Sequence, residues 1–176
     1  DVELIKKIDS CYGIHPLVLE DILNTEQRPK VEDHDEYLFI VLKMVYFDKT
    51  VNDIVGEQVS LVVGENYVIS FQETAEEGDV FDPIRERIRE NKGRVRKMGA
   101  DYLAYVLLDS IIDNYFLVIE KIGDQIEKLE ERVMVDASPN IPKEIHQLKS
   151  VLIYLRRQIW PLREVLSILQ RSESKI

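Results

Sequence analysis

Apolar residues follow two different patterns along this chain of 176 residues. The segments Tyr37–Phe47, Gln58–Val63 and Tyr67–Gln72 are short and rich in β-branched and aromatic residues, which favours strands. From Asp101 onwards, apolar residues recur every three or four positions, which is typical of helices. The pattern therefore predicts a sheet in the first part of the chain and long helices in the second.

The connections between the predicted strands indicate how they pair. Gly64-Glu65-Asn66 supplies the residues of a tight reversal between the second and third strands. Asp48–Gly56 is expected to be a longer loop between the first and second. The prediction is an α+β fold in which an antiparallel sheet is flanked by helices, and strands added by a preceding N-terminal segment would enlarge the sheet and could make it mixed.

Two short helices are expected before the sheet. Apolar residues at helical spacing predict the first over residues 1–12, and Gly13 ends it. Pro16 is suited to the first turn of the second helix, which should run from His15 or Pro16 to near Asn24. On its helical wheel the apolar residues share one sector, and Glu20 and Asp21 lie on the opposite sector.

The adjacent carboxylates of Glu20 and Asp21 repel each other, so they are either well solvated or able to bind a cation. Acidic residues near the first turn of a surface helix are common because the helix dipole favours them there. The residues alone favour that ordinary interpretation, and the cation site stays open beside it.

A third helix is predicted from Asp82, as the N-cap before Pro83, to about Asn91. The only basic stretch of the chain begins in this helix and comprises Arg85, Arg87, Arg89, Lys92, Arg94, Arg96 and Lys97. It is either a site for phosphate or nucleotide or a solvated face that offsets acidic neighbours. The second interpretation is preferred because no glycine-rich phosphate loop accompanies the arginines.

One long helix is predicted from Asp101 to about Val135. Its core stripe consists of Leu107, Ile111, Val118, Ile122 and Leu129. An acidic stripe on another side consists of Asp109, Asp113, Glu120, Asp124, Glu127 and Glu131. Like charges four residues apart destabilise a helix by a few tenths of a kcal/mol, roughly, so external positive charge should compensate. Hydrated Mg²⁺ and the following helix are both candidates for that charge.

The following helix should pair with the first as a hairpin after a turn at Asp136–Pro142, with Asn140 as a possible N-cap. Its apolar seam consists of Ile145, Leu148, Leu152, Leu155, Ile159, Leu162, Leu166 and Leu169. Such a seam requires another helix along its whole length. The first helix carries nine acidic and three basic residues, whereas Lys143–Lys175 carries seven basic and three acidic. We therefore expect the helices to neutralise each other from Glu120 to Glu131, and metal binding only near Asp109.

Pro161 lies inside this seam and should kink or locally open the helix without ending it. Trp160, the neighbouring residue, is predicted to belong to the core. The simplest division of the chain is an α/β portion over residues 1–100 and the helical hairpin over residues 101–176, both within one domain.

Composition limits the classes of function. A net charge of −10 argues against a nucleic-acid binder, which needs a basic surface, and suits a protein that gathers cations. The single cysteine, Cys11, excludes an internal disulfide. No continuous run of about 18 apolar residues occurs, and the best candidate, Tyr37–Phe47, is short and interrupted by Lys43, so the chain alone is expected to be soluble.

Several motifs occur together and in a characteristic order. They are GIHPLVLEDILN from Gly13, QRPKVE from Gln27, YLFIVLKM from Tyr37, EQVSLVV from Glu57, GDVFDPIRERIR from Gly78 and IWPLREVLS from Ile159. Together they resemble the cytoplasmic domain of the CorA family of magnesium channels. The resemblance covers nearly the whole chain, from about Tyr12 to Leu169.

The resemblance implies a homopentameric membrane channel for Mg²⁺ that also carries Co²⁺ and Ni²⁺. It further implies that regulatory divalent ions lie between neighbouring subunits, bound by Glu20 and Asp21 of the LEDIL motif and by Asp109 of the long helix. The partner carboxylates would come from a stalk helix of the adjacent subunit. This sequence contains neither that stalk, nor the Gly-Met-Asn pore signature, nor the two membrane spans of the family.

We therefore expect a trimmed, soluble piece of a cell-membrane protein, on the cytoplasmic side, that senses Mg²⁺ without conducting it. The alternative is a soluble helical-hairpin module that binds a protein partner and has no metal-dependent role. An enzyme of phosphoryl chemistry ranks last because a nucleophile and a phosphate loop are missing. His15, His34 and His146 are scattered without metal-ligand spacing, and no catalytic residue is assigned.

Overall fold

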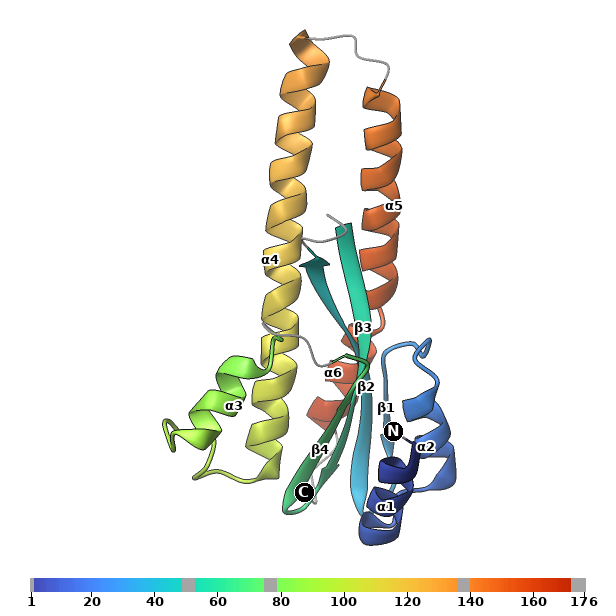
Figure 1. Cartoon of the computed structure of the whole chain (residues 1–176), viewed down its shortest axis with the longest axis vertical. Coiled ribbons are helices and arrows are strands. Elements are labelled where there is room, and N and C mark those ends of the chain that lie inside the picture. Colours follow the sequence, from blue (N-terminus) through green and yellow to red (C-terminus); the bar gives the residue numbers. More distant parts are fainter. Residues whose placement is uncertain (1, 49–52, 75–78, 136–139, 172–176) are drawn as a thin grey trace.

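The computed structural model describes residues 2–48, 53–74, 79–135 and 140–171. The helices are α1 (Val2–Tyr12), α2 (Pro16–Leu23), α3 (Asp82–Arg89), α4 (Ala100–Val135), α5 (Ile141–Ile159) and α6 (Leu162–Arg171). The strands are β1 (Lys30–Asp33), β2 (Tyr37–Asp48), β3 (Asp53–Gly64) and β4 (Tyr67–Gln72). The α+β fold expected from the sequence is confirmed, with α4 and α5 extending beyond the sheet as a long hairpin (Figure 1).

The sheet has the order β1-β2-β3-β4, and every neighbouring pair of strands is antiparallel. Gly64 pairs with Tyr67, so the predicted tight turn between β3 and β4 is confirmed. The predicted long loop at Asp48–Gly56 is wrong, because β3 begins at Asp53 and pairs there with Asp48. β1 is a strand that the sequence did not reveal, since its residues, KVED, are few and mostly charged.

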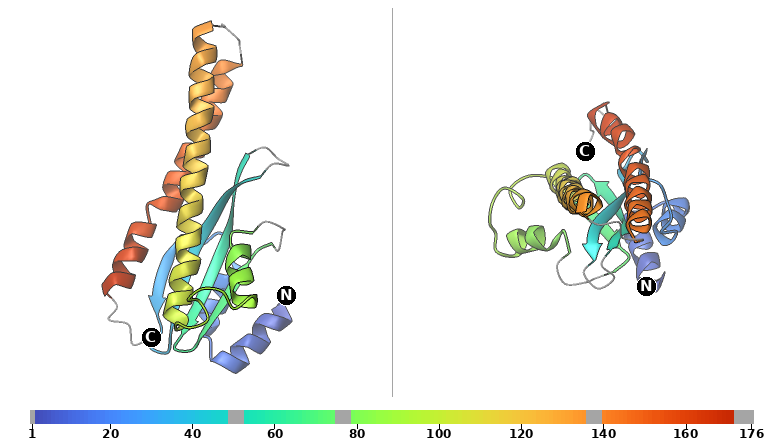
Figure 2. Two further views of the ribbon diagram at one scale, coloured as in Figure 1. Left: turned by 90° about the vertical axis from the view of Figure 1, so that its left-hand side faces the viewer. Right: turned by 90° about the horizontal axis from the view of Figure 1, so that it is seen from above.

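Each face of the sheet is covered by its own helices (Figure 2). Because side chains alternate along a strand, β2 sends Leu38, Ile40 and Leu42 into a core with α4, α5 and α6. The intervening residues of β2, Tyr37, Phe39 and Val41, meet Ile14, Val18 and Ile22 from α2 and its start on the other face. The sheet is therefore the middle layer of three, which explains why its strands are apolar on both faces.

The predicted core stripe of α4 is confirmed, since Leu107, Ile111, Val118, Ile122 and Leu129 are all buried. Asn114 and Tyr115 fix the helix to β2, because their side chains donate hydrogen bonds to the carbonyl oxygens of Val45 and Lys43, respectively. Burial raises the pKa of the Tyr115 hydroxyl, with a smaller contribution from Tyr154, so it stays protonated and remains a donor.

The seam of the following helix is only half covered. Leu155 and Leu162 are buried, whereas Ile145, Leu152 and Leu166 are 43–50% exposed, so the expectation of a partner helix along the whole seam is not met within the described chain. α5 does approach the sheet closely, since a Cβ on Gly56 of β3 would collide with the hydroxyl of Tyr154.

The helix is interrupted at Pro161: α5 ends at Ile159 and α6 begins at Leu162. The expected local opening at Pro161 is therefore confirmed, whereas the expectation that one helix continues past it is wrong. Trp160 keeps helical backbone angles, and its amide still donates to the carbonyl oxygen of Arg156. Trp160 is also not a core residue, because it is 71% exposed. α6, beyond the interruption, packs against β1.

Helix starts differ slightly from the predictions. The N-cap position of α3 is Phe81, and Asp82 is the first helical residue instead of the cap. Asn140 does occupy the N-cap position of α5, but its side chain makes no capping hydrogen bond. The predicted break between α1 and α2 is confirmed at Gly13, whose φ of 63° lies in the left-handed region.

One described helix, Ala100–Met134 within α4, is long and apolar enough to cross a membrane by length and composition. A search for continuous apolar runs misses it because acidic residues interrupt the stretch. A third of its most apolar window, 33%, is buried inside the protein, and the core helix of a soluble protein passes the same test. Packing on the sheet accounts for the buried apolar residues of α4, whereas Tyr105, Phe116 and Leu117 are exposed.

Candidate functional site

The short helix α2 carries the Glu-Asp pair that the sequence singled out. Its start is fixed by His15, whose Nδ1 accepts a hydrogen bond from the amide of Leu17 at 3.2 Å. The amide of His15 in turn donates to the buried Tyr37 hydroxyl at 2.8 Å. Since Val18 and Ile22 are buried against the sheet, the rotation of α2 about its axis is set, and with it the directions of Glu20 and Asp21.

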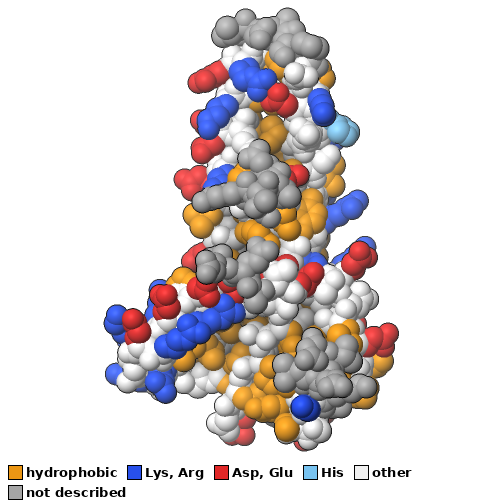
Figure 3. Space-filling view, in the orientation of Figure 1, with side chains coloured by type: hydrophobic (Ala, Val, Ile, Leu, Met, Phe, Trp, Pro, Cys, Tyr) orange, Lys and Arg blue, Asp and Glu red, His pale blue; other side chains and the backbone are white. Residues whose placement is uncertain are grey.

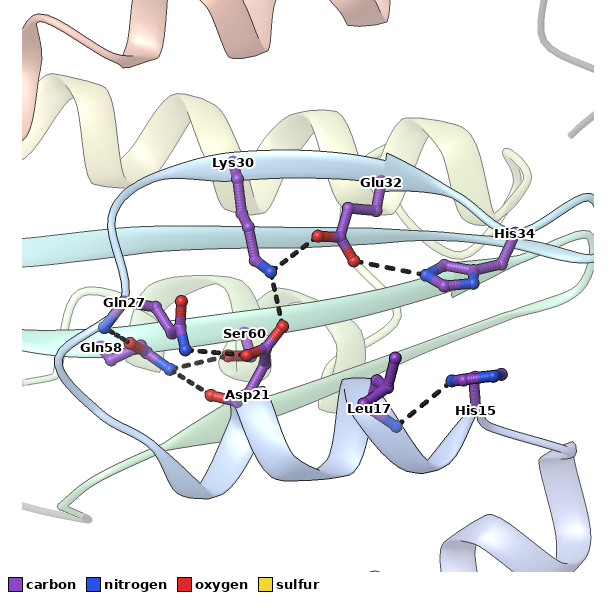
Figure 4. Close-up of polar contacts among 9 residues, drawn as sticks. All are labelled: His15, Leu17, Asp21, Gln27, Lys30, Glu32, His34, Gln58 and Ser60. Atoms are coloured by element: carbon purple, nitrogen blue, oxygen red, sulfur yellow. Dashed lines mark hydrogen bonds and ion pairs between the residues drawn. The ribbon is translucent and has the colours of Figure 1, made fainter.

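Asp21 does not point freely outward as the helical wheel predicted. Its Oδ2 lies 2.5 Å from Nζ of Lys30, and its Oδ1 accepts a hydrogen bond from Nε2 of Gln27 at 2.7 Å (Figure 4). The side chains of Asp21 and Lys30 are only 22% and 28% exposed. The carboxylate is therefore already neutralised from within the same chain. Glu20, its neighbour, is exposed.

Lys30 connects Asp21 to a second carboxylate. Its Nζ also donates to Oε1 of Glu32 at 2.7 Å, and Oε2 of Glu32 lies 3.5 Å from Nε2 of His34. Burial lowers the pKa of the Lys30 ammonium, but the hydrogen bonds and charges of Asp21 and Glu32 outweigh that effect, so its pKa is raised. Lys30 is thus a firmly charged cation between two carboxylates.

Gln58 of β3 holds the chain segment that leads from α2 to Lys30. Its Nε2 donates to the backbone carbonyl of Asp21 at 3.0 Å, and its Oε1 accepts from the amide of Gln27 at 3.1 Å. The Gln58 side chain is buried, so these bonds are shielded from water. Sequence reasoning missed Lys30, Gln27 and Gln58, because their role depends on a strand, β1, that was not recognised.

Asp109 lies far from this cluster in the fold, on the outer side of α4. It is exposed, as are Asp113, Glu120, Asp124, Glu127 and Glu131 of the predicted acidic stripe. Figure 3 shows acidic side chains along the outer edge of α4. None of the ion pairs found among the described residues involves this stripe. Its charge is left to solvent or to another molecule.

The expected neutralisation of the stripe by the following helix is wrong for the described residues. The ion pair that joins the two helices is Arg132–Glu144, with Nη1 and Oε2 2.6 Å apart. Its basic member belongs to the acidic helix and its acidic member to the basic helix, the reverse of the expected polarity. Net charges of two helices therefore did not predict which residues pair, because pairing depends on register.

The basic stretch near α3 is divided between structural and solvated residues. Arg85 lies 2.6 Å from Asp79 and 2.9 Å from Asp82, and it also donates to Gln72 at 2.5 Å. These bonds connect α3 to β4, and they occupy the guanidinium group of Arg85 within the protein. Arg87, Arg89 and Arg94 are exposed, which agrees with the preferred interpretation of a solvated face.

In the part of the chain that the structure describes, no group of three or more His, Cys, Asp and Glu side chains could hold a metal ion. Glu20 and Asp21 are adjacent on α2, and Asp109 is not brought together with them. The carboxylates offer the oxygen ligands that Mg²⁺ prefers, but further ligands must come from water or from another molecule.

Comparisons with known proteins agree with this architecture. A family model described as CorA-like Mg²⁺ transporter protein matches residues 1–176. The cobalt/magnesium transport protein CorA of Thermotoga maritima is 53% identical over 169 residues, which are 96% of this chain and 48% of that protein. The putative metal ion transporter YfjQ of Bacillus subtilis is 29% identical over 88% of this chain and 46% of its own length. The chain thus spans about half the length of these relatives.

Solved structures show the same fold. The soluble domain of CorA from Methanocaldococcus jannaschii matches with a TM-score of 0.82 and 21% identity, over 99% of this chain and 68% of that one. The complete CorA magnesium transporter of that organism gives 0.83 and 20%, over 100% of this chain and 54% of that one. The match over the whole sequence and the shared fold lead to one conclusion: the chain belongs to the CorA family of Mg²⁺ transporters.

Proposed function

We propose that this chain is the cytoplasmic, Mg²⁺-sensing domain of a homopentameric membrane transporter for Mg²⁺ and Co²⁺. Divalent ions bound between neighbouring subunits would control its gate, with Glu20, Asp21 and Asp109 among their ligands. The observation that carries the proposal is the exposed acidic edge of α4, which has no ion-pair partner within the described chain. Family membership supports the transported ions, since relatives are named as cobalt and magnesium transport proteins.

The mechanism is electrostatic. Carboxylates of adjacent subunits repel each other when the cytosol holds little Mg²⁺, and bound ions cancel that repulsion when Mg²⁺ is abundant. A ligand shifts an equilibrium between two states only if it binds one of them better. A site built from two subunits meets this condition because it exists only while the subunits are together.

Large apolar side chains on α4 support a site of this kind at a contact between chains. Tyr105, Phe116 and Leu117 are 57%, 66% and 57% exposed, which is unusual for a helix that faces only water. Burial of these side chains by a neighbouring helix would bring the acidic edge of α4 against another molecule. Ions would then offset the like charges that such a contact assembles.

The two halves of the proposed ligand set differ in how readily they can bind an ion. Asp109 is exposed and needs only to exchange water. Asp21 must exchange its contact with Lys30 for one with the ion, so Lys30 competes with Mg²⁺ for the same carboxylate. We therefore expect Lys30 to raise the Mg²⁺ concentration at which Asp21 is occupied.

The first test is thermal unfolding of the chain in millimolar Mg²⁺, at an ionic strength held constant with NaCl. The unfolding midpoint of the wild type should rise to a plateau, and Asp109→Asn should weaken that rise. Glu131→Gln removes an equal charge from the far end of the same stripe and serves as the matched control, which should respond as the wild type does. An equal response in all three proteins would contradict ion binding at Asp109. No response in any of them would mean that the site needs the neighbouring subunit, which is present in the second test.

The second test concerns gating and uses the complete transporter in lipid vesicles. Mg²⁺ loaded inside, on the side of this domain, should suppress Mg²⁺ influx, as followed by a fluorescent indicator. The Asp109→Asn variant should need a higher internal Mg²⁺ concentration for the same suppression, while Glu131→Gln should not. Suppression that is identical in both variants would refute a regulatory role for Asp109.

A further inference from the structure

A groove of about 1120 Å³ opens where the interruption between α5 and α6 faces the connection from α2 to β1. Its walls include Arg28 from that connection, Arg156 and Arg157 from α5, and Trp160 beside Pro161. Lys43 of β2 and Glu73 after β4 also line it. The groove therefore joins three parts of the chain that are far apart in sequence. It borders the proposed carboxylate site at Gln27, which lines the groove and donates to Asp21.

The charge of this groove contrasts with that of the whole protein. Arg28, Arg156 and Arg157 are exposed, and none of them forms an ion pair with another described residue. Three guanidinium groups without a carboxylate partner around one groove are unexpected in a chain of net charge −10, which has enough carboxylates to pair with them. A guanidinium group presents planar N–H donors that match the oxygens of phosphate groups.

The acidic residues of the groove do not cancel these arginines. Glu73 is engaged with its own surroundings, because its Oε1 accepts from the amide of Gln58 at 2.5 Å and lies 3.8 Å from Nζ of Lys43. Lys43 also donates to the carbonyl oxygen of Thr25. Burial lowers the pKa of the Lys43 ammonium, against the raising effect of Glu73, Glu26 and Glu57. Glu26 is exposed and is the other acid that lines the groove.

Trp160 adds an aromatic surface to this set of cations. It is 71% exposed, and the guanidinium carbon of Arg156 lies 5.7 Å from the centroid of its ring. An exposed indole beside arginines provides a face on which a planar ring can stack. Trp160 keeps helical backbone angles at the end of α5, and the interruption at Pro161 follows it directly.

We propose that this groove binds a nucleotide, with its phosphate groups on Arg28, Arg156 and Arg157 and its base on Trp160. A concave site with a few convergent polar groups can enclose a small ligand, whereas it fits the flat surface of a membrane poorly. The arginines of α3 do not offer an equivalent site, since Arg85 is already bound to Asp79 and Asp82. The proposal does not depend on the Mg²⁺-sensing role of the carboxylates.

The test exploits the fact that Trp160 is the single tryptophan of the chain. ATP is added to the chain in Mg²⁺-free buffer while tryptophan fluorescence is recorded, and affinity is measured in parallel by isothermal titration calorimetry. Saturable binding that changes the fluorescence is expected. Inorganic triphosphate should bind more weakly and adenosine more weakly still, because each supplies only one half of the ligand.

Two variants test the phosphate-binding arginines and the base-stacking tryptophan separately. The double variant Arg156→Gln/Arg157→Gln should weaken ATP binding about tenfold or more, since charge-assisted hydrogen bonds are lost. Arg87→Gln/Arg89→Gln on α3 changes the net charge equally and should bind ATP as the wild type does. Trp160→Ala should weaken ATP binding about tenfold but leave inorganic triphosphate unaffected, because only a base can stack there.

Three results would overturn the proposal. The first is the absence of saturable ATP binding by calorimetry. The second is an equal loss of affinity in the α3 control variant, which would mean that the arginines act only through net charge. The third is fluorescence that responds to vesicles of anionic phospholipid or to self-association of the chain but not to ATP, which would assign the groove to a membrane or to a second copy.

Discussion

Two groups of carboxylates in this protein differ in how their negative charge is neutralised. Asp21 and Glu32 share the ammonium group of Lys30 and lie against the sheet, with the pair at Asp21 largely shielded from water. The acids of the outer edge of α4, from Asp109 to Glu131, lie in solvent without an ion pair among the described residues. One group is neutralised by the fold itself, and the other relies on whatever the surroundings supply.

The difference shows that an acidic residue is not a cation site merely because it is acidic. At α2 the chain supplies its own cation, the ammonium group of Lys30. An incoming divalent ion must displace this group, so its net binding free energy is smaller. At α4 an incoming ion displaces only water and relieves repulsion between neighbours. The same ligand type can therefore respond to Mg²⁺ over different concentration ranges in one domain.

The largest effect is expected when Lys30 is replaced. Lys30→Met leaves Asp21 and Glu32 without their common cation and should lower the free energy of unfolding by about 1–2 kcal/mol at neutral pH. Because the pKa of Lys30 is raised in the folded state, this contribution is present at neutral pH and disappears only as pH rises through that raised value. Chemical denaturation followed by circular dichroism measures it.

Mg²⁺ makes the same variant more informative. An ion that replaces the ammonium group should stabilise Lys30→Met more than the wild type. Lys149→Met, which removes an exposed lysine of α5 that forms no ion pair with another described residue, is the control and should behave as the wild type does. An unchanged Mg²⁺ response in Lys30→Met would show that Lys30 and the ion do not compete.

A smaller effect is expected at Glu57, a third kind of carboxylate that is buried and only 5% exposed. Burial raises its pKa, hydrogen bonds from Thr74 and Gln72 act in the opposite direction, and the charges of Asp79 and Glu73 raise it further. The folded state therefore holds the proton more tightly than the unfolded state, so this group adds stability as pH falls from neutral.

Glu57→Gln should accordingly raise the free energy of unfolding at neutral pH, by up to about 1 kcal/mol. The gain should shrink as pH is lowered towards the ordinary pKa of a glutamate, where the wild type becomes protonated. Denaturation curves of both proteins across that pH range give the comparison. A gain that does not vary with pH would mean that packing, not ionisation, causes it.

The smallest effect is expected on the acidic edge. Glu127→Gln removes one like-charge pair with Glu131 and should raise stability by about 0.2–0.5 kcal/mol at low salt, with no gain at high salt. Asp101→Asn should instead lower the stability, because Asp101 lies in the first turn of α4, where a negative charge is favourable. Destabilisation by Glu127→Gln at low salt would indicate that Glu127 has a cationic partner in solution.

Much of the fold could be predicted from the sequence because it depends on local periodicity. The core stripe of α4, the strand Tyr67–Gln72 and the break at Gly13 all follow from spacing within a few residues. β1 could not be found this way, since KVED carries no apolar pattern and is a strand only because β2 pairs with it. Pairing with β2 in the folded protein, and not the local sequence, makes this segment a strand.

The candidate site could be predicted only as residue types. The sequence placed Glu20 and Asp21 on one helix and Asp109 on another, and these positions are confirmed, while their role as ligands stays a prediction. It could not predict that Lys30 would reach Asp21, because the contact needs both β1 and the turn held by Gln58. The prediction that Trp160 belongs to the core was also wrong, since it rested on the residue type, whereas Trp160 lies on an exposed side at the end of α5.

The interruption at Pro161 has a mechanical consequence. Fewer backbone hydrogen bonds cross Pro161 than cross an intact turn, so bending α5 relative to α6 costs less there than elsewhere along the two helices. α5 has 19 residues and is therefore about 28 Å long. If α6 stays packed on β1, a rotation of α5 by about 10° about Pro161 would move the far end of α5 by about 5 Å. A small change in the groove beside Trp160 would thus be magnified at the tip of the hairpin.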